Sequence, residues 1–182
     1  MTSSEADLLC VVGGESTGKS TLVSALARDL PGLELPETLR SWVEQRGRVP
    51  TAGEQIEVMS AHAAAEEAAR GEAGRLGLRW VVSDGGTLMT AVYSIVYYDD
   101  DSLVDEAMTS TAFSRLVVWC AADIPWAADE MRDGPELRSA AQQVIGEVLE
   151  SSGVPWLRVT GPVGQRVEQV RERLDAAGGT VG

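Results

Sequence analysis

The stretch that decides the fold is Gly13-Gly14-Glu15-Ser16-Thr17-Gly18-Lys19-Ser20-Thr21, a G-x-x-x-x-G-K-S pattern near the start of the chain. It follows the apolar run 8–12, LLCVV, and leads into a helical pattern that begins at Leu22. A strand before the pattern and a helix after it are the context of a phosphate-binding loop, or P-loop. The glycines at 13 and 18 permit a backbone whose N–H groups converge on a phosphate at the positive end of the helix.

The P-loop predicts a nucleotide ligand, and the expected cofactors are ATP and Mg²⁺. We expect the whole stretch from Gly13 to Thr21 to hold the ATP phosphates. Lys19 would supply a mobile positive charge for the β- and γ-phosphate oxygens, and Ser20 a hydroxyl for the metal.

Length and composition predict one domain, residues 1–182, with 1–6 and 178–182 as disordered tails. No apolar run approaches the length of a membrane span, and the first residues lack the features of a secretory signal. We therefore expect a soluble, cytoplasmic protein without a membrane partner. Cys10 and Cys120 fall in predicted strands, where buried thiols are expected rather than a disulfide.

The formal charge of −13 argues against a nucleic-acid partner, because phosphate backbones are bound by clustered Lys and Arg. Lys19 is the only lysine and His62 the only histidine. A guanine-reading N-K-x-D segment needs a second lysine, so a GTPase is not expected, and multi-histidine metal sites are excluded. The expected partner is a small molecule, and association into a homo-oligomer stays open.

The order of apolar runs and helical patterns predicts an α/β fold. Predicted strands and predicted helices alternate along the chain. The strands are expected at 7–12, 33–36, 79–83, 115–120 and 155–159, and the main helices at 22–30, 53–75, 87–98, 135–150 and from 162 onward. Four of the five strands are continuous apolar runs, which is typical of a parallel sheet covered on both faces. The prediction is a three-layer, P-loop nucleotide-kinase-like fold with a five-stranded parallel sheet.

Charged residues follow three of the predicted strands. Glu37 comes after the second strand, Asp84 after the third, and an arginine-bearing loop after the fourth. In open α/β sheets this edge faces the ligand. Phosphoryl transfer uses a base or hydroxyl-orienting group, a carboxylate on the metal side and a mobile cation over the transferred phosphate. A motor-type ATPase usually places Glu directly after the strand-end Asp, whereas Gly85 follows Asp84 here.

The motifs, taken together, resemble those of the NadR-type ribosylnicotinamide kinases, a P-loop nucleoside kinase family. The resemblance lies in the P-loop, Pro36-Glu37-Thr38-Leu39-Arg40, Asp84 before 88–94, and Ile124-Pro125-Trp126 with Asp129 and Arg132. It implies a nucleotide-kinase-like fold and the phosphorylation of the 5′-hydroxyl of nicotinamide riboside by ATP and Mg²⁺. The product would be nicotinamide mononucleotide, in NAD biosynthesis.

The resemblance also implies roles for single residues. Glu37 and Arg40 correspond to a segment near the acceptor, and Arg132 to a lid arginine. The spacing from Glu37 to Trp42 is similar to a segment of deoxynucleoside kinases, in which the Glu acts near the acceptor hydroxyl and the Trp beside the base. The candidate catalytic residues are Lys19, Glu37, Asp84 and Arg132, and the candidate substrate residues are Glu37, Arg40, Trp42, Asp84, Tyr93 and Asp129.

Several assignments stay open. Either Glu37 or Asp84 is the base, and Asp84 is also a metal candidate with Ser20. Trp42 and Tyr93 either stack on a flat heterocycle or belong to the core. His62 is expected on the surface of the long helix or behind the substrate residues, with substrate binding as the alternative, and Arg166 has a place near adenine as one alternative.

The sequence departs from the family where D-T-D is common after the third strand, because this chain has Asp84-Gly85-Gly86 and lacks one carboxylate. Glu130 also replaces the lid glycine. The alternatives are therefore a kinase for another nucleoside or a specialised metabolite, or a non-kinase ATP-binding regulatory protein.

Overall fold

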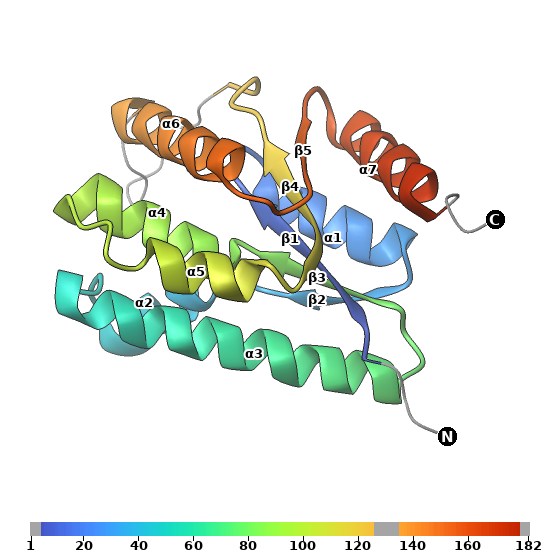
Figure 1. The fold of residues 1–182 in the computed structure, drawn as a ribbon, viewed down its shortest axis with the longest axis horizontal. Coiled ribbons are helices and arrows are strands. Elements are labelled where there is room, and N and C mark those ends of the chain that lie inside the picture. Colours follow the sequence, from blue (N-terminus) through green and yellow to red (C-terminus); the bar gives the residue numbers. More distant parts are fainter. Residues whose placement is uncertain (1–4, 126–134, 179–182) are drawn as a thin grey trace.

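The computed structural model describes residues 5–125 and 135–178, which form five strands and the helices around them (Figure 1). The strands are β1 Asp7–Val12, β2 Gly32–Leu35, β3 Trp80–Asp84, β4 Ser114–Cys120 and β5 Trp156–Val159. The helices are α1 Lys19–Asp29, α2 Thr38–Arg46, α3 Gln55–Arg75, α4 Gly86–Tyr98, α5 Val104–Thr111, α6 Pro135–Ser151 and α7 Val163–Gly178, with a 3₁₀ turn, η1, at Ala52–Glu54. The predicted order of strands and helices is confirmed.

The strands form one parallel sheet in the order β2-β3-β1-β4-β5. Strand β1 lies at the centre, between β3 and β4. Because every strand runs in the same direction, the loops that follow the strands meet at one edge of the sheet. Val11 pairs with Asp84 in register, so the end of β3 lies beside the start of the P-loop.

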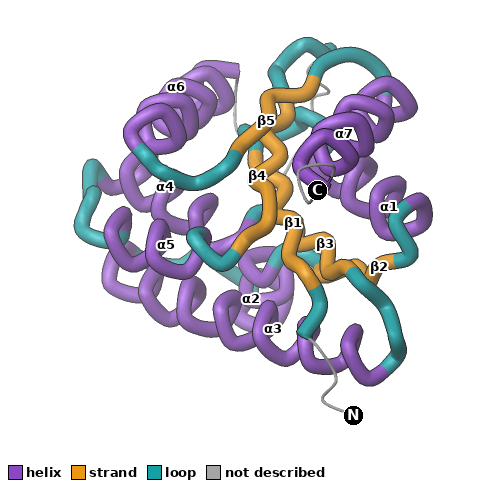
Figure 2. Tube along the Cα trace, turned by 45° about the vertical axis from the view of Figure 1, so that its right-hand side comes forward, coloured by secondary structure: helices purple, strands orange, loops and turns teal. Residues whose placement is uncertain are grey.

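Alternating side chains of β1 are buried on the two faces of the sheet. Figure 2 shows the helical layers that cover these faces. Leu9 and Val11 pack with residues of α1 and α7 on one face. Cys10 and Val12 pack with α4 and α6 on the other face, where α3 continues the layer. This alternation produces the three layers that the sequence predicted, because a parallel sheet must bury both of its faces.

The tail predictions need one correction. Residues 1–4 and 179–182 lie outside the described residues, but Glu5 and Ala6 are described and contact α3. Arg70 donates a hydrogen bond from Nε to the Ala6 carbonyl at 3.0 Å and pairs with Glu5 at 2.9 Å. The described chain therefore packs against α3 two residues earlier than predicted, and Gly178 ends helix α7.

Both cysteines are buried and free, as expected for small core residues. Burial raises the pKa of the Cys120 thiol to about 11, so this thiol stays protonated at neutral pH. None of the helices in the described ranges is long and apolar enough to cross a bilayer.

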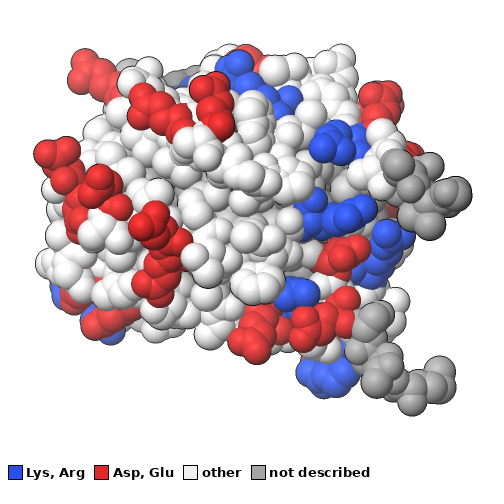
Figure 3. Space-filling view, viewed as in Figure 1, with Lys and Arg blue, Asp and Glu red and all other residues white. Residues whose placement is uncertain are grey.

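Charged side chains are distributed unevenly on the face drawn in Figure 3. Most of the Lys and Arg side chains on this face gather where the strands begin, with carboxylates among them. Over the helices farther from that edge the charged groups are mostly Asp and Glu. This face therefore offers no broad basic surface.

Candidate nucleotide and acceptor site

The P-loop joins β1 to α1, and its backbone leaves the start of the helix open. Gly18 precedes the helix with a φ of 83°, in the left-handed region that glycine favours, and no side chain caps α1. The first N–H groups of α1 are therefore available to an anionic ligand at the positive end of the helix. Within the loop, the Thr17 hydroxyl donates to the Gly14 carbonyl at 2.8 Å.

Lys19 lies against this loop, with its side chain almost fully buried. Its Nζ donates to the Gly14 carbonyl oxygen at 3.2 Å, and the residue is 8 % exposed. The only lysine of the sequence thus lies against the loop that the P-loop pattern marks.

Ser20 and Asp84 are brought into direct contact. Ser20 Oγ donates to Asp84 Oδ2 at 2.6 Å, while Asp84 Oδ1 is buried and has no hydrogen-bond partner. The Ser20 hydroxyl and the Asp84 carboxylate, one of whose oxygens is buried and unpaired, are ligands that suit Mg²⁺. This ion prefers oxygen ligands and keeps several waters. In the described part of the chain, no group of three or more His, Cys, Asp or Glu is placed so that it could hold a metal ion. Water and phosphate oxygens would therefore supply the other ligands.

Glu37 lies at the same edge, at the N-terminus of α2. Because Leu35 pairs with Ser83 in the sheet, Glu37 follows β2 beside the end of β3. Burial raises the pKa of the Glu37 carboxyl above its usual value of 4.5; nearby Lys19 opposes that rise and Asp84 adds to it. A carboxyl group with a raised pKa beside the P-loop is suited to accept a proton near neutral pH.

A small cavity adjoins Glu37. Its volume of about 10 Å³ has room for roughly one water-sized group. It is lined by Glu37, Leu39, His62, Gly85, Gly86, Met89, Thr90 and Tyr93. Tyr93 lines this cavity and is also part of the hydrophobic core between β1 and helices α4 and α6. A whole nucleoside would require the walls of the cavity to move apart.

Trp42 is not among the residues that line this cavity. It is 9 % exposed, and the guanidinium carbons of Arg46 and Arg48 lie 4.6 and 5.3 Å from its ring centroid. Its ring therefore packs against cations of its own chain rather than facing the cavity residues. Arg40 is an exposed residue of the same helix whose charge acts on the Glu37 carboxyl.

Close packing against β1 explains why glycine stands at position 86, where the D-T-D sequence of the NadR-type kinases has its second carboxylate. Gly86 has a φ of 59°, and a Cβ at this position would lie 2.3 Å from Cys10 Sγ. A side chain of any kind at position 86 would collide with the central strand. Glycine at position 86 is therefore required by this packing.

Of the two positions expected for His62, the one on the surface is wrong, and the residue is buried beside the cavity that adjoins Glu37. His62 is 2 % exposed, and its Nε2 lies 2.9 Å from Ser83 Oγ and 3.2 Å from Glu66 Oε1. No pattern in the sequence separated it from its exposed neighbours on α3, because the helix is rich in Ala and Glu on all sides.

Two buried arginines support the P-loop from behind, and the sequence did not predict this. Arg166 donates from Nη1 to the Thr17 carbonyl at 2.7 Å, so it lies beneath the loop. Arg138, on α6, donates to the Ile124 carbonyl at 2.9 Å, and a Cβ on Gly14 would meet the Arg138 carbonyl oxygen at 2.9 Å. Both contacts join distant parts of the chain, which local sequence patterns do not reveal.

Two predicted site residues, Asp129 and Arg132, lie outside the described residues, as does Trp126 of the same motif. They belong to the segment between β4 and α6, which leaves β4 at the same edge of the sheet as the P-loop. Their roles remain predictions from the sequence.

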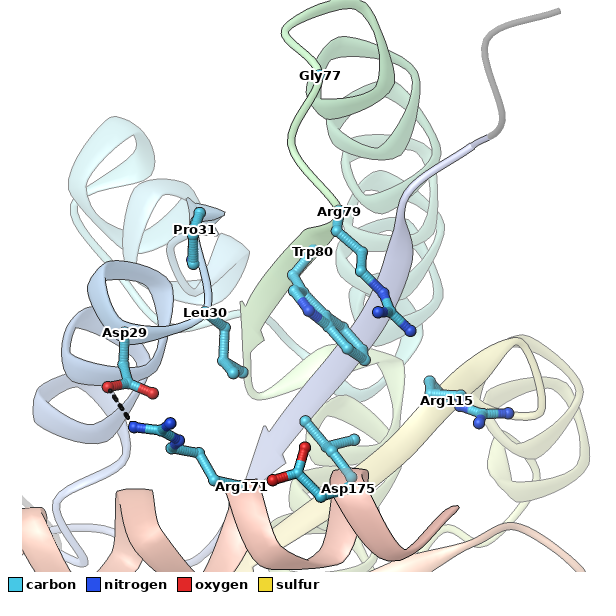
Figure 4. A pocket seen from close by; sticks show the side chains of 10 residues that line it. Asp29, Leu30, Pro31, Gly77, Arg79, Trp80, Arg115, Arg171 and Asp175 are labelled. Atoms are coloured by element: carbon cyan, nitrogen blue, oxygen red, sulfur yellow. Dashed lines mark hydrogen bonds and ion pairs between the residues drawn. The ribbon is translucent and has the colours of Figure 1, made fainter. Parts of the chain in front are cut away.

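A larger cavity of about 620 Å³ lies at the opposite edge, where the strands begin (Figure 4). Arg79, Arg115 and Arg171 line it beside Trp80, and Asp29 and Asp175 bring compensating charge. Arg171 lies 3.5 Å from Asp29. This cavity contains neither the P-loop nor Glu37, so the candidate site is the smaller one at the carboxyl edge.

Solved structures of kinases have the same arrangement of elements. The structure is similar to NadR in complex with NR, with a TM-score of 0.74 and 18 % identity over 93 % of this chain and 52 % of the NadR chain. Thymidylate kinase from Ehrlichia chaffeensis has a TM-score of 0.68 and 12 % identity over 94 % of this chain and 99 % of its own. Deoxyadenosine kinase from M. mycoides with bound dATP has a TM-score of 0.63 and 14 % identity over 93 % of this chain and 99 % of its own.

At these identities the likeness shows the fold, which is that of the P-loop nucleotide kinases, as predicted. The chain spans about half the length of the NadR chain. No curated protein matches the sequence. Residues 8–166 match the sequence model of a family described as an AAA domain, a match that runs from β1 to Arg166 and includes the P-loop, Glu37 and Asp84. The chain therefore belongs to this AAA domain family.

Proposed function

We propose that the protein is an ATP-dependent kinase that phosphorylates a hydroxyl group of a nucleoside. The observation that supports this most is the meeting of three groups at one edge of the sheet: the P-loop, the Ser20–Asp84 pair and Glu37 beside a cavity. The phosphate cradle, a metal-binding oxygen pair and a carboxyl that can accept a proton are the parts that phosphoryl transfer needs.

In the proposed reaction the acceptor hydroxyl attacks the γ-phosphorus of ATP. An O–P bond forms to the acceptor, the bond to the β-phosphate oxygen breaks, and ADP leaves. The P-loop N–H groups and Lys19 hold the phosphates, and Lys19 gives up its bond to the Gly14 carbonyl for phosphate oxygens. Bound Mg²⁺, held through Ser20 and Asp84, would neutralise charge on the β- and γ-phosphates.

We assign the base role to Glu37 rather than Asp84. Asp84 already accepts the Ser20 hydroxyl through Oδ2, which fits the metal side of the site. Glu37 has the raised pKa and lines the cavity on the acceptor side, so it can take the hydroxyl proton as the new bond forms. Arg132, which the structure does not describe, is proposed to approach the transferred phosphate from the segment after β4.

For the acceptor we propose nicotinamide riboside, which would give nicotinamide mononucleotide. The sequence motifs support this choice, together with the fold likeness to a NadR structure that holds NR. A different nucleoside or a specialised metabolite is the second candidate. Two features favour this second candidate, because they change the acceptor side of the site. Gly86 stands where the family commonly has a carboxylate, and the Arg46 and Arg48 side chains lie against Trp42. A nucleotide-binding regulator without an acceptor is a third.

An acceptor panel with ATP and Mg²⁺ tests the proposal directly. Nicotinamide riboside and the common nucleosides are incubated with the protein, and the phosphate ester is identified by mass spectrometry. An ester that disappears with Lys19→Ala supports the kinase. Release of ADP that is independent of every acceptor, or ATP binding alone, would favour the regulatory protein, and an unchanged rate in Lys19→Ala would refute the site.

A further inference from the structure

Behind the cavity lies a buried, hydrogen-bonded group made of His62, Ser83 and Glu66. His62 and Glu66 lie one turn apart on α3, and Ser83 is the residue of β3 directly before Asp84. Ser83 Oγ lies 2.7 Å from Glu66 Oε1, and His62 Nε2 lies 2.9 Å from Ser83 Oγ. The three residues are 2 %, 0 % and 6 % exposed for His62, Ser83 and Glu66. The imidazole is therefore fixed through one of its two nitrogens.

The hydrogen-bond roles in this group determine the tautomer of His62. A glutamate carboxylate only accepts hydrogen bonds, so the Ser83 hydroxyl donates its single hydrogen to Glu66. His62 Nε2 then faces two acceptor oxygens, from Ser83 and Glu66, and must itself carry a hydrogen. In the neutral ring this leaves Nδ1 as an acceptor.

His62 also lines the cavity that adjoins Glu37. Among the described residues that line the cavity there is no Lys or Arg, and Thr90 and Tyr93 bring hydroxyl groups. An imidazole nitrogen that accepts hydrogen bonds pairs with a donor, so the cavity is suited to a ligand group that donates one. At about 10 Å³ the space has room for one hydroxyl.

We propose that His62 Nδ1 accepts a hydrogen bond from a second hydroxyl of the acceptor, one that is not phosphorylated. Glu37, which is only half-buried and feels the charges of Lys19 and Asp84, takes the reacting hydroxyl. Ser83 and Glu66 act as positioning residues that hold the imidazole in the accepting tautomer. The site then selects sugars with at least two hydroxyls over their deoxy analogues. This inference rests on the proposed function, since it assigns a role within the same acceptor site.

Matched substrates test the proposal kinetically. Each nucleoside that the protein phosphorylates is compared with its 2′-deoxy and 3′-deoxy forms, in the wild type and in His62→Phe, which keeps a flat ring but removes both nitrogens. We expect the wild type to prefer the hydroxylated form over one of the deoxy forms by about 10- to 100-fold in kcat/KM. His62→Phe should lose most of this preference, through slower turnover of the hydroxylated form. An equal loss on all three substrates, or an unchanged preference, overturns the proposal.

A second measurement needs neither a variant nor turnover. His62 is the only histidine, so an untagged chain with ¹⁵N-labelled histidine gives one set of ring signals. We expect the Nε2–H tautomer in the free protein and a change of the Nδ1 signal when nicotinamide riboside or a panel ribonucleoside binds beside a non-hydrolysable ATP analogue. The deoxy form that lacks the bonded hydroxyl should leave the signal unchanged, and Ser83→Ala should weaken the tautomer preference.

The two measurements separate failure of this inference from failure of the proposed function. The role of His62 is overturned, and the kinase activity still supported, if a phosphate ester forms but the NMR result is negative. A negative result is an Nδ1–H tautomer, or the same Nδ1 signal for hydroxylated and deoxy ligands. A hydroxyl-dependent signal without ester formation from any acceptor refutes the kinase and supports the sugar-binding role. Absence of any ligand-dependent change at Nδ1 overturns the inference.

Discussion

Arg166 donates a hydrogen bond from Nη1 to the Thr17 carbonyl oxygen at 2.7 Å and so joins the last helix to the P-loop across 149 positions of sequence. The same guanidinium donates to the Gly161 carbonyl at 2.8 Å and pairs with Asp123. The residue is 2 % exposed. One buried cation therefore connects the P-loop with the loops that follow β4 and β5.

Replacing Arg166 by alanine should loosen the P-loop as well as the core. We expect Arg166→Ala to lower the free energy of unfolding by about 2–4 kcal/mol, because several acceptors lose a charged donor at once. ATP affinity should fall with it. Urea unfolding and titration calorimetry with ATP measure the two effects.

Arg171 is the matched control on the same helix. Its pair with Asp29 at 3.5 Å is largely exposed, so Arg171→Ala should change stability by less than about 1 kcal/mol and leave ATP binding intact. Equal effects of the two alanines would contradict the proposal that Arg166 stabilises the P-loop.

Glu37→Gln tests the base. The amide keeps the size of the side chain but cannot take a proton, so kcat should fall by about 10²- to 10⁴-fold with little change in ATP affinity. In the wild type the rate should rise with pH through a limb above 4.5, because the pKa of Glu37 is raised by burial. A wild-type rate in Glu37→Gln would remove this residue from the base role.

Glu37→Gln should increase stability at neutral pH, although it lowers kcat. A carboxyl whose pKa is raised on folding favours the native state at low pH, and this contribution is lost as pH rises through the native pKa. Glu37→Gln should therefore be more stable than the wild type at neutral pH. The difference should shrink toward pH 4.5 and below, as followed by thermal unfolding across pH. A variant less stable than the wild type at neutral pH would contradict the half-buried environment of Glu37 that disfavours its charged form.

Asp84→Asn tests the metal assignment. Because Asp84 Oδ1 is buried and unpaired while Oδ2 accepts the Ser20 hydroxyl, removal of the charge should weaken the hold on Mg²⁺. We expect activity to require a higher Mg²⁺ concentration and the maximal rate to fall by about 10²-fold or more. Asp175→Asn removes the same charge at the far cavity and should behave like the wild type. An unchanged Mg²⁺ requirement in Asp84→Asn would place the metal elsewhere.

Gly86→Ala tests the packing that fixes the end of β3. A φ of 59° and a Cβ 2.3 Å from Cys10 Sγ should together cost about 2–4 kcal/mol of stability. The double variant with Cys10→Ala should recover the steric part only. Gly71, on α3, has nothing within 4 Å, so Gly71→Ala should be neutral or stabilising by up to about 1 kcal/mol. Wild-type stability in Gly86→Ala would contradict the tight approach.

Much of the fold could be predicted because its signals are local. Strand β1 was predicted with its observed bounds, Asp7–Val12, since a continuous apolar run directly before a P-loop pattern is typical of a buried central strand. Ser20 and Asp84 were each predicted as metal-side residues, from the P-loop pattern and from the position of Asp84 at the end of a strand. Their direct contact was not predicted.

The rest depends on tertiary packing that the sequence does not display. His62 is buried because α3 turns that residue toward Ser83, and an Ala- and Glu-rich helix gives almost no sign of which side faces the sheet. Trp42 has its aromatic face against Arg46 and Arg48, four and six positions along the chain, which a stacking prediction could not anticipate. Arg166 binds the loop at a separation of 149 residues.

Strand β1 lies at the centre of the sheet and separates two flanks that contribute different residues to the site. Glu37, His62 and Tyr93 come from the flank that holds β2, β3 and the helices after them, whereas Arg166 and Asp123 come from the β4 and β5 flank. Under the proposed function, substitutions of Glu37, His62 or Tyr93 would change acceptor binding and leave the contacts of Arg166 beneath the P-loop in place. Asp84 is the exception on the first flank, because it contacts Ser20 of the P-loop directly.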